Sequence, residues 1–468
     1  MFRVFSAPLS ATFRLDHLAA GAWHAGEEIA WLEGNGGPPQ LAWDSLVAFG
    51  PPLELIETRG ENPFTKIQRV LSRKIDISEI ESSFHGGGIG YIGYECGRFF
   101  ERIPTAPERI FDLPDCRMFF PQAWVAKQKG KEPSICCIVD GDARAGLRGL
   151  DAARTHALRL ELLGSQRRTA STPEAHVAAL WSRERYLLSA AWVIQQIGNG
   201  EIYQANLSQP FVAADTADPF DVYLRLLERN PSPFSAFLGF GNFAIVSASP
   251  ELFLRRRGQF IETRPIKGTR PRTGNLQIDN AAILELESSE KDAAELAMIV
   301  DLERNDLSRV CEPGSVNVAR AREIESYATV FHGVATVEGK LQNGIDTTQL
   351  LKATFPGGSI TGCPKIRAVE LLNEVEHEAR GVNFGAIGWI QWNGDLDLNV
   401  AIRTLSFRRD TNASGAAAWN CSFRTGGGIV AESDPRMEYD ESFAKARALA
   451  NALGDSQFPN TLSMTAQK

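Results

Sequence analysis

Hydrophobic and polar residues alternate in short segments over the first 140 residues of this 468-residue chain. Segments 53–59 (LELIETR) and 134–141 (SICCIVDG) have the pattern of strands, and Gly/Pro-rich pieces such as GNGGPP separate such segments. We therefore predict short strands broken by turns in this part. From residue 148 to 163 the spacing changes to that of a helix, and a polar stretch with a Thr-Pro step, 164–175, follows.

The rest of the chain mixes helical and strand-like segments. Helical spacing recurs in four of them: 183–200, 288–310, 357–378 and 438–453. Strand-like patterns fill five others: 201–211, 234–269, 385–392, 398–409 and 417–430. Because the two kinds alternate in mixed order without an internal repeat, we predict a large α/β or α+β sandwich with its sheets inside and helices outside.

The polar stretch after residue 163 is the candidate domain boundary. We expect an N-terminal lobe at 1–165, a catalytic region at 176–455 and a C-terminal tail at 456–468. A hydrophobic fraction of 43% is ample for a large core.

Charge and cysteine usage exclude several classes of protein. The formal charge is −8, and the longest basic run, Arg255–Arg257, has the pattern of a hairpin tip, so we expect no nucleic-acid partner. The seven cysteines form no CxxC, and their number is odd, which argues against a disulfide framework or a zinc site. The N-terminus lacks a signal-peptide core, and no stretch approaches ~20 apolar residues, so we expect no membrane partner and a cytoplasmic location.

Two glycine-rich segments resemble nucleotide-binding motifs. Residues 88–93, GIGYIG, match GxGxxG, but the segment before them is a poor strand, and alternating residues after them favour a strand over a helix start. We predict close backbone packing there. GGSITGCPK lacks the GK[ST] of a P-loop, so a nucleotide cradle is not expected.

Four acidic residues stand three apart in two of the helical segments. Asp292 and Glu295 share one helix face, and Glu438 and Glu441 share another, with Lys445 one turn beyond. Two such faces could converge on Mg²⁺, which takes one or two protein carboxylates and completes its shell with water and ligand oxygens. On spacing alone, two solvated helix faces with ordinary ion pairs are the commoner outcome.

Two glycine-rich turns and one arginine could bind anions. FPGGSITGCPK places hydroxyls and Pro364 near a helix start, where free N–H groups attract a carboxylate. FRTGGGIV offers a second run of unobstructed N–H groups. Arg403, within an apolar strand, needs either a carboxylate ligand or an internal acid as its partner, and the sequence leaves both open.

Lys267 and Glu251 are candidates for proton and nucleophilic chemistry. Lys267, in RPIKGTRPR, is either a solvated loop amine or an amine held near a substrate. Burial or a nearby cation would lower its pKa and leave a nucleophilic neutral amine. Glu251 follows SASP at a turn between strands, where partial burial would let it keep its proton and act as a general acid. These residues predict an enzyme for a small dianionic substrate.

The chain resembles the chorismate-utilising enzymes from about residue 180 to 453. The resemblance is carried by EIYQANLSQPF, SASPELF, RPIKGTRPR, SSEKDAAELAMIVDLERNDLSRVC, FPGGSITGCPK, AIRT and GGGIVAESDPRMEYDESFAKA. The N-terminal lobe matches more loosely, through GGGIGYIGYECGRFFE. The resemblance implies a two-lobed sandwich whose mixed or antiparallel sheets, flanked by helices, enclose the active site.

The same resemblance assigns roles to the candidate residues. It implies that Glu295 and Glu441 bind Mg²⁺ directly, that Asp292 and Glu438 assist through water, and that Mg²⁺ holds the ring carboxylate of chorismate. It implies that Glu251 protonates the departing 4-hydroxyl. The implied substrate-binding residues are Gln204, Gly268, Thr269, Gly358, Ser359, Thr361, Arg403, Gly426, Gly427 and Lys445. His332, in TVFHGV, matches the active-site histidine, although a lone histidine is often structural.

Two positions separate the members of this family. Isochorismate and salicylate synthases carry a water-activating lysine where this chain has Gln204, which argues against water addition. Anthranilate synthases have PIAGT where this chain has PIKGT around Lys267. The PIKGT of aminodeoxychorismate enzymes implies that the lysine attacks ring carbon C2 as the 4-hydroxyl leaves, and that ammonia then enters at C4 and expels the lysine.

The resemblance also implies a partner and a product. No glutamine-cleaving cysteine/histidine site is visible, so we expect ammonia from a separate glutaminase subunit. The expected product is 4-amino-4-deoxychorismate, which feeds 4-aminobenzoate and folate synthesis. The main alternative is the anthranilate synthase component I reaction. A non-catalytic chorismate-binding regulatory subunit is a second alternative, which the retained acids and Lys267 disfavour.

Overall fold

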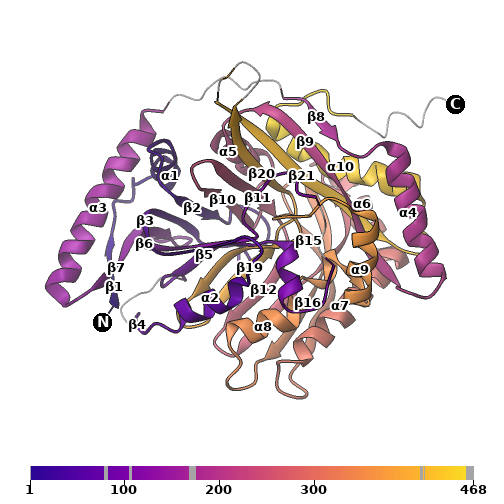
Figure 1. The fold of residues 1–468 in the computed structure, drawn as a ribbon, viewed down its shortest axis with the longest axis horizontal. Helices are drawn as coiled ribbons and strands as arrows, with labels where there is room; N and C mark the ends of the chain where they lie inside the picture. Colours follow the sequence, from indigo (N-terminus) through magenta and orange to yellow (C-terminus); the bar gives the residue numbers. More distant parts are fainter. Residues whose placement is uncertain are drawn as a thin grey trace.

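The computed structural model describes residues 2–77, 83–104, 108–167, 175–411, 415 and 417–459 (Figure 1). Within these residues lie ten α-helices: α1 (Leu15–His24), α2 (Pro63–Leu71), α3 (Ala143–Ser165), α4 (Arg183–Gly198), α5 (Pro219–Arg229), α6 (Leu276–Ser288), α7 (Glu290–Ser308), α8 (Thr347–Thr354), α9 (Lys365–Val375) and α10 (Pro435–Leu453). Two short 3₁₀ helices are η1 (Tyr94–Phe99) and η2 (Gly358–Ile360).

The same residues contain 21 strands. Those of the first 140 residues are β1 (Phe2–Pro8), β2 (Ile29–Glu33), β3 (Ser45–Thr58), β4 (Ile75–Asp76), β5 (Gly87–Ile92), β6 (Cys116–Lys127) and β7 (Ser134–Asp140). The later strands are β8 (Val177–Ala179), β9 (Gln204–Thr216), β10 (Phe234–Gly239), β11 (Phe243–Ser249), β12 (Leu252–Arg257), β13 (Phe260–Arg264), β14 (Ile266–Pro271), β15 (Asn317–Ser326), β16 (Val330–Lys340), β17 (Gly362–Cys363), β18 (Ala386–Gln391), β19 (Leu396–Val400), β20 (Thr404–Thr411) and β21 (Ala417–Ile429).

Strand β6 joins two long antiparallel runs of strands. Along one edge it pairs with β3, and this run continues through β2, β10, β11, β20 and β21 to β9. Along the other edge it pairs with β5, and this run continues through β18, β19, β12 and β13 to β16, which also pairs with β14 and β15. The N-terminal strands therefore contribute to both runs.

A single hydrophobic cluster fills the space between the two runs. It contains Leu238 and Ile245 from the first run together with Leu398 and Ile390 from the second, all 1% exposed or less. Because neighbouring strand residues point to opposite faces, Phe237 belongs instead to a second cluster on the other face. The apolar core is thus split into an inner and an outer layer, as in a sandwich.

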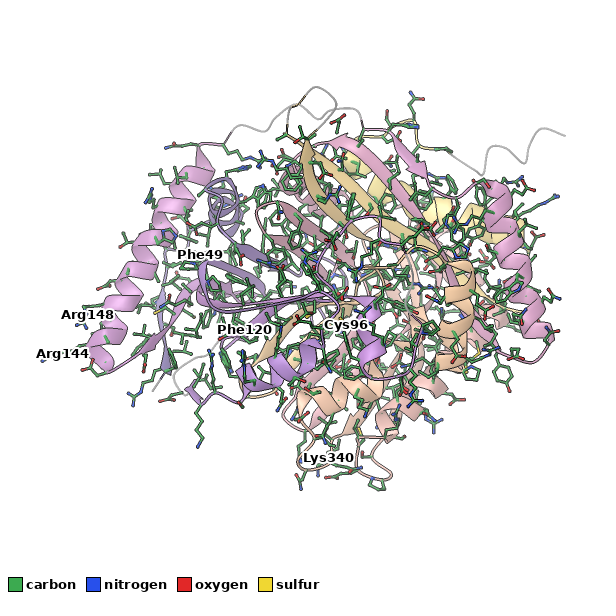
Figure 2. All side chains as sticks on the ribbon, viewed as in Figure 1. Phe49, Cys96, Phe120, Arg144, Arg148 and Lys340 are labelled. Carbon is green, nitrogen blue, oxygen red and sulfur yellow. The ribbon has the colours of Figure 1, made fainter. Side chains whose placement is uncertain are left out.

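Helices cover the outer faces of the runs. α10 packs on β21, α5 on β11, and α3 on β7. α7 packs on β14, β15 and β16, which brings its acidic face close to Lys267 on β14. Figure 2 shows Arg144 and Arg148 on the outer side of α3, whereas Phe49 and Phe120 lie inside, both at most 1% exposed. This arrangement confirms the predicted sandwich of antiparallel sheets flanked by helices.

Most of the predicted elements are confirmed, but helices α5, α6 and α8 and strands β15 and β16 lie between the predicted segments and were missed. The GIGYIG segment forms β5, the helix ending at Gly198 is α4, and the arginine run leads into the β12–β13 hairpin turn. The prediction of strands and turns alone for the first 140 residues was wrong, because α1 and α2 also lie there. Seven of the ten residues of α1 are buried, so the helix has little polar face to reveal its period.

The strand pairing does not test the predicted domain boundary. The two parts of the chain share their sheets, because β2 pairs with β10 and β5 pairs with β18. Residues 168–174 of the polar stretch, and the tail from residue 460, lie outside the described residues. The division at 1–165, 176–455 and 456–468 stays a prediction.

Cysteine pairing and membrane insertion can both be judged from the described residues. All seven cysteines are free, as their number and spacing indicated. None of the helices in the described part of the chain combines the length and the apolar character that a membrane span requires.

Candidate active site

Lys267 lies on strand β14, so the interpretation as a solvated loop amine was wrong. Its Nζ donates to the carbonyl oxygen of Ser359 at 3.3 Å. Burial lowers the pKa of Lys267, and the carboxylates of Glu295 and Glu251 partly oppose this shift by favouring the charged form. The site therefore holds an amine that loses its proton more readily than free lysine.

Glu251 occupies the tight connection between β11 and β12 and is only 4% exposed. Burial raises its pKa to about 7, against the opposing influence of a side-chain hydrogen bond with Ser359 and of the Lys267 charge. A substantial fraction of Glu251 thus carries a proton near neutral pH. Glu251 and Lys267 meet at Ser359, as expected for an acid and a nucleophile acting on one substrate.

His332 points one ring nitrogen at a neighbour and leaves the other unpaired. Nδ1 lies 2.9 Å from the hydroxyl of Thr269 on the paired strand β14. Nε2 is buried and has no hydrogen-bond partner among the described residues. Burial, aided by the Arg403 charge, lowers the pKa of His332 to about 3, so the ring is neutral at physiological pH. An unpaired buried ring nitrogen is a candidate contact for a ligand.

Arg403 has a backbone conformation that few residues adopt. It follows β19 with a φ of 49°, in the left-handed region that costs a non-glycine residue about 1–3 kcal/mol. No described carboxylate lies within ion-pair distance of its guanidinium, which removes the alternative of an internal acid partner. Burial lowers its pKa. Strain and an unpaired cation at one residue are features of a ligand site.

The glycine-rich turn at η2 is held on several sides. The Gly358 N–H donates to Oε1 of Glu303 at 2.9 Å, so a carboxylate bound at Gly358 would have to displace that side chain. The Thr361 hydroxyl donates to the Gly357 carbonyl at 2.9 Å. Ser359 is the residue of this turn that faces Lys267 and Glu251.

Gly427 leaves room for two carboxylates. A Cβ atom at this position would lie 3.1 Å from Oε2 of Glu438 and 3.5 Å from Oε1 of Glu441. Gly426 and Gly427 pair with Ser208 and Leu207 along β9. Two acids so close to this backbone would repel a bound anion unless a cation neutralised them.

The predicted metal-binding acids converge from α7 and α10. Burial raises the pKa of Glu295 and of Glu438, and in both cases the charge of Glu441 raises it further. Glu441 itself has a lowered pKa, mainly because the Lys445 ammonium lies 2.7 Å from it. Glu438 is 5% exposed, so the alternative of solvated helix faces fails for this residue. The Glu441 side chain is 50% exposed and forms an i,i+4 ion pair with Lys445, as that alternative expects.

Asp292 also acts on this group, since its charge raises the pKa of Glu295. It accepts from Arg270 at 3.0 Å and therefore already has a cationic partner. Among the residues that the structure describes, no three acidic, histidine or cysteine side chains lie close enough together to form a metal site on their own. The convergence of Glu295, Glu438 and Glu441 fits a hard cation that takes few protein ligands and fills its shell with water and substrate oxygens.

Three further predicted residues have partners or neighbours that qualify their roles. The Lys445 ammonium donates to the Gly426 carbonyl at 2.8 Å in addition to its pair with Glu441. Gln204, 1% exposed, has a buried amide oxygen without a described partner. A Cβ atom at Gly268 would lie only 2.9 Å from Cγ of Asp292, so the glycine leaves room for that side chain. Substrate contacts of these residues stay predictions.

The sequence interpretation missed several buried charged residues beside this site. Glu303 and the ion pair of Asp306 with Lys365 lie behind the η2 turn, and burial raises the pKa of Glu303. Glu376 and Arg380 form a second buried pair. The spacing of Glu376 and Arg380, four apart in EHEAR, was the available signal, but this spacing is common on exposed helices.

Comparison with known proteins gives one consistent result. A family model described as chorismate binding enzyme matches residues 28–451. Aminodeoxychorismate synthase component 1 of Salmonella typhimurium is 38% identical over 378 residues, which cover 79% of this chain and 77% of that protein. Its namesake in Bacillus subtilis is 36% identical over 432 residues, with coverages of 92% and 84%. The crystal structure of anthranilate synthase component I from Streptococcus pneumoniae matches with a TM-score of 0.73 and 30% identity, covering 87% of this chain and 92% of that one.

The environment of Lys267 predicts its titration. We expect amine-selective labelling of Lys267, followed by mass spectrometry across a pH series, to have its midpoint below 10.5, since burial disfavours the ammonium. Glu295→Gln should lower the midpoint further, because the Glu295 carboxylate stabilises the charged form. A midpoint above 10.5 would contradict the inferred environment.

Proposed function

Because the chain belongs to the family of chorismate binding enzymes, we propose that it converts chorismate and ammonia to 4-amino-4-deoxychorismate, the reaction of an aminodeoxychorismate synthase component 1. The product would serve 4-aminobenzoate and folate synthesis. The observation that carries the proposal is the environment of Lys267. This partly buried amine has a lowered pKa and lies near Glu251, whose carboxyl group keeps its proton near neutrality.

In the first half of the reaction, Lys267 acts as nucleophile. Its neutral amine attacks C2 of the chorismate ring, the ring double bonds shift, and the C4–oxygen bond breaks. Glu251 gives its proton to the departing hydroxyl, which leaves as water. The result is a secondary ammonium that joins Lys267 to C2 and a Glu251 carboxylate.

In the second half, ammonia forms a bond to C4 and the electrons shift back. The C2–nitrogen bond breaks, its electron pair returns to Lys267, and the amine is again neutral. The new group at C4 is first an ammonium, and it releases one proton that returns to the Glu251 carboxylate, so the acid is restored for the next cycle. Chorismate and ammonia are thereby converted to product and water.

The remaining residues orient the substrate. The unpaired guanidinium of Arg403 suits a substrate carboxylate, since it is pre-oriented by its strained backbone and has no described acid partner. His332, neutral and held by Thr269, offers Nε2 to the substrate. Glu295 and Glu441 would hold Mg²⁺, with Glu438 and Asp292 assisting through water, and the bound ion would neutralise a substrate carboxylate.

We further propose that ammonia comes from a glutaminase partner. The relatives named component 1 support a second component, and an excess of ammonium should replace it in the assay. The free state of all seven thiols is compatible with the reducing cytoplasm, which we propose as the location.

Product analysis tests the reaction. With chorismate, MgCl₂ and excess ammonium, 4-aminobenzoate should form only when an aminodeoxychorismate lyase is added. Lys267→Ala should lower the rate roughly 100-fold or more, since the nucleophile is lost. Lys340→Ala, an exposed lysine that pairs with Glu312, is the control. Anthranilate formed without lyase would favour the alternative reaction, and a fully active Lys267→Ala protein would rule out the covalent role.

The raised pKa of Glu251 predicts a pH dependence. The acid form of Glu251 is present below pH 7 and is lost as pH rises through about 7. The fraction of neutral Lys267 grows over the same range, so kcat/KM for chorismate should rise with pH up to about 7 and then level off. Glu251→Gln should reduce the rate about 10²–10⁴-fold, because the amide has no proton to give. Free ammonia should be held constant across the series. A kcat/KM that kept rising in proportion to neutral Lys267 through pH 7 and beyond would contradict the assignment.

Metal removal tests the acidic residues. Chelation should abolish activity, and added Mg²⁺ should restore it. Calorimetric titration of Mg²⁺ into the protein with chorismate should show binding weakened more than about tenfold by Glu295→Gln or Glu441→Gln. Glu290→Gln, at an exposed position on the same helix α7, is the matched control. Full activity without any divalent cation would exclude the metal role.

A further inference from the structure

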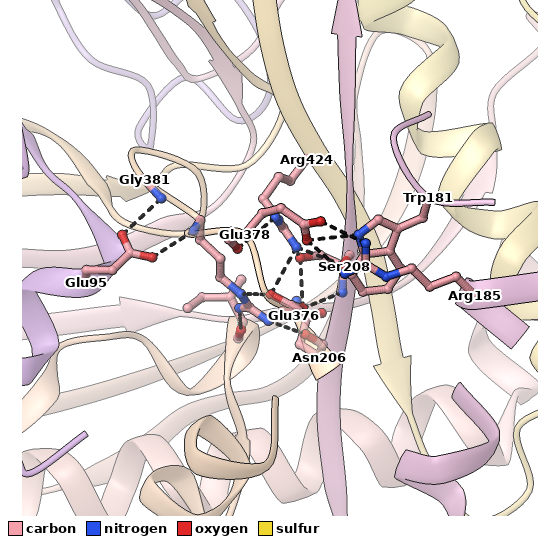
Figure 3. Close-up of polar contacts among 11 residues, drawn as sticks. Glu95, Trp181, Arg185, Asn206, Ser208, Glu376, Glu378, Gly381 and Arg424 are labelled. Atoms are coloured by element: carbon pink, nitrogen blue, oxygen red, sulfur yellow. Dashed lines mark hydrogen bonds and ion pairs between the residues drawn. The ribbon is translucent and has the colours of Figure 1, made fainter. Parts of the chain in front are cut away.

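A buried cluster of charges beside the η2 turn has no part in the steps above (Figure 3). Glu376 follows α9, Arg380 precedes β18, and Arg424 lies on β21. The side chains of all three are at most 4% exposed. Groups so deeply buried are costly to desolvate unless each charge is paired and hydrogen-bonded.

Glu376 is the centre of the cluster. Its carboxylate accepts from Nε and an Nη of Arg380 at 2.8 and 2.9 Å, and from both the N–H and the hydroxyl of Ser208 at 2.8 and 3.0 Å. Arg424 adds an ion pair at 3.1 Å. Although burial raises the pKa of Glu376, the two arginines outweigh it and the pKa is lowered. Glu376 is therefore a fully paired anion.

Arg380 extends from this anion to the active-site backbone. Its guanidinium donates to the carbonyl of Ile360 at 2.9 Å and to the carbonyl of Asn206 at 2.6 Å. The rings of Tyr94 and Phe384 lie 4.5 and 4.8 Å from its central carbon. A planar guanidinium with donors in a fixed fork can hold these groups at once, which a lysine cannot do.

The carbonyl that accepts from Arg380 belongs to Ile360, the residue next to Ser359. Ile360 lies between Ser359, which contacts Lys267 and Glu251, and Thr361, whose carbonyl accepts from the N–H of Asn206 at 2.8 Å. Arg380 thus ties together the η2 turn and strand β9 at adjacent positions.

Arg424 extends the same cluster to the second glycine-rich segment. Its Nε and an Nη donate to the hydroxyl and the carbonyl of Ser208, both at 3.0 Å. Two residues later on β21 comes Gly426, whose carbonyl accepts from Lys445. Both segments predicted to bind substrate carboxylates are therefore anchored on Glu376.

Stability alone is a weak reason for such a cluster. Well-packed apolar residues often stabilise a core as much as a buried ion pair does, because they avoid the desolvation cost. What an apolar group cannot do is hold a carbonyl oxygen in a defined direction. A displacement of about 1 Å can cost roughly 100-fold in rate at a reacting site.

We propose that Arg380 and Glu376 are positioning residues that fix the η2 turn so that Ser359 presents its carbonyl and hydroxyl to Lys267 and Glu251. This inference rests on the proposed function of that site. Neither residue touches the substrate. They act through Ile360 and Ser359.

The test compares Arg380→Lys and Glu376→Gln with Arg185→Lys. Arg185 pairs with Glu378 at 2.8 Å in the same region but has no contact with the turn, so it is a matched control. We expect Arg380→Lys to raise KM for chorismate about tenfold, because the carboxylate-binding turn is no longer held. We expect amine labelling of Lys267 at pH 8 to accelerate about threefold as its Ser359 acceptor is lost. The melting temperature of Arg380→Lys should fall below that of Arg185→Lys, because Arg380 is buried and Arg185 is partly exposed, so KM and labelling are compared at a temperature where both variants are folded.

The outcomes separate this proposal from the proposed function. If Arg380→Lys equals Arg185→Lys in both KM and labelling rate, the positioning role is wrong. Should Arg380→Lys not fold, Glu376→Gln must show the same two changes, and failure of both variants to fold would reveal a purely structural cluster. Labelling does not need turnover, so a change in Lys267 labelling in a protein that makes no aminodeoxychorismate would keep the positioning role and reject the proposed reaction.

Discussion

The sharing of β6 by two strand runs is the constraint on which the rest of the structure depends. Its pairing with β3 on one edge and β5 on the other makes both runs start from the same strand. The runs must then pack through one inner apolar layer. Residues separated by more than 150 positions in the chain, such as Glu251 and Glu441, come within electrostatic reach of Lys267 because of this closure.

Burial sets the chemistry of the groups that this closure encloses. It is the largest influence on Glu251, Lys267, His332 and Arg403, and in each case it favours the uncharged form. A carboxyl becomes a proton donor near neutrality, an amine becomes easier to deprotonate, and an imidazole stays neutral. Burial likewise raises the pKa of Glu295 and Glu438, and the neighbouring charge of Glu441 raises it further.

Near Lys267 and Glu251, buried charged side chains form hydrogen bonds with the backbone. Glu303 accepts a hydrogen bond from the N–H of Gly358, and Arg380 donates one to the carbonyl of Ile360. The η2 turn is therefore hydrogen-bonded on both sides of Ser359. Hydrogen bonds of this kind cost desolvation but define direction, which apolar packing does not. Burial therefore has two effects at this site. It shifts the pKa of groups such as Lys267 and Glu251, and it lets hydrogen bonds fix the direction of the backbone groups around them.

The type of most elements and the candidate site residues could be read from the sequence, because periodic burial and ordered motifs are local properties of the chain. The strand at GIGYIG, helices α4, α7 and α10, and the residues Lys267 and Glu251 could all be found in this way. Helix α1, buried on nearly all sides, could not be found, because it lacks a polar face. The pKa shifts, the lack of a described acid partner for Arg403, the ion pair of Asp292 with Arg270 and that of Glu376 with Arg380 could not be predicted from the sequence. These features depend on which side chains, distant in the sequence, lie close together in the low-dielectric interior. The spacing of residues along the chain does not specify which side chains meet.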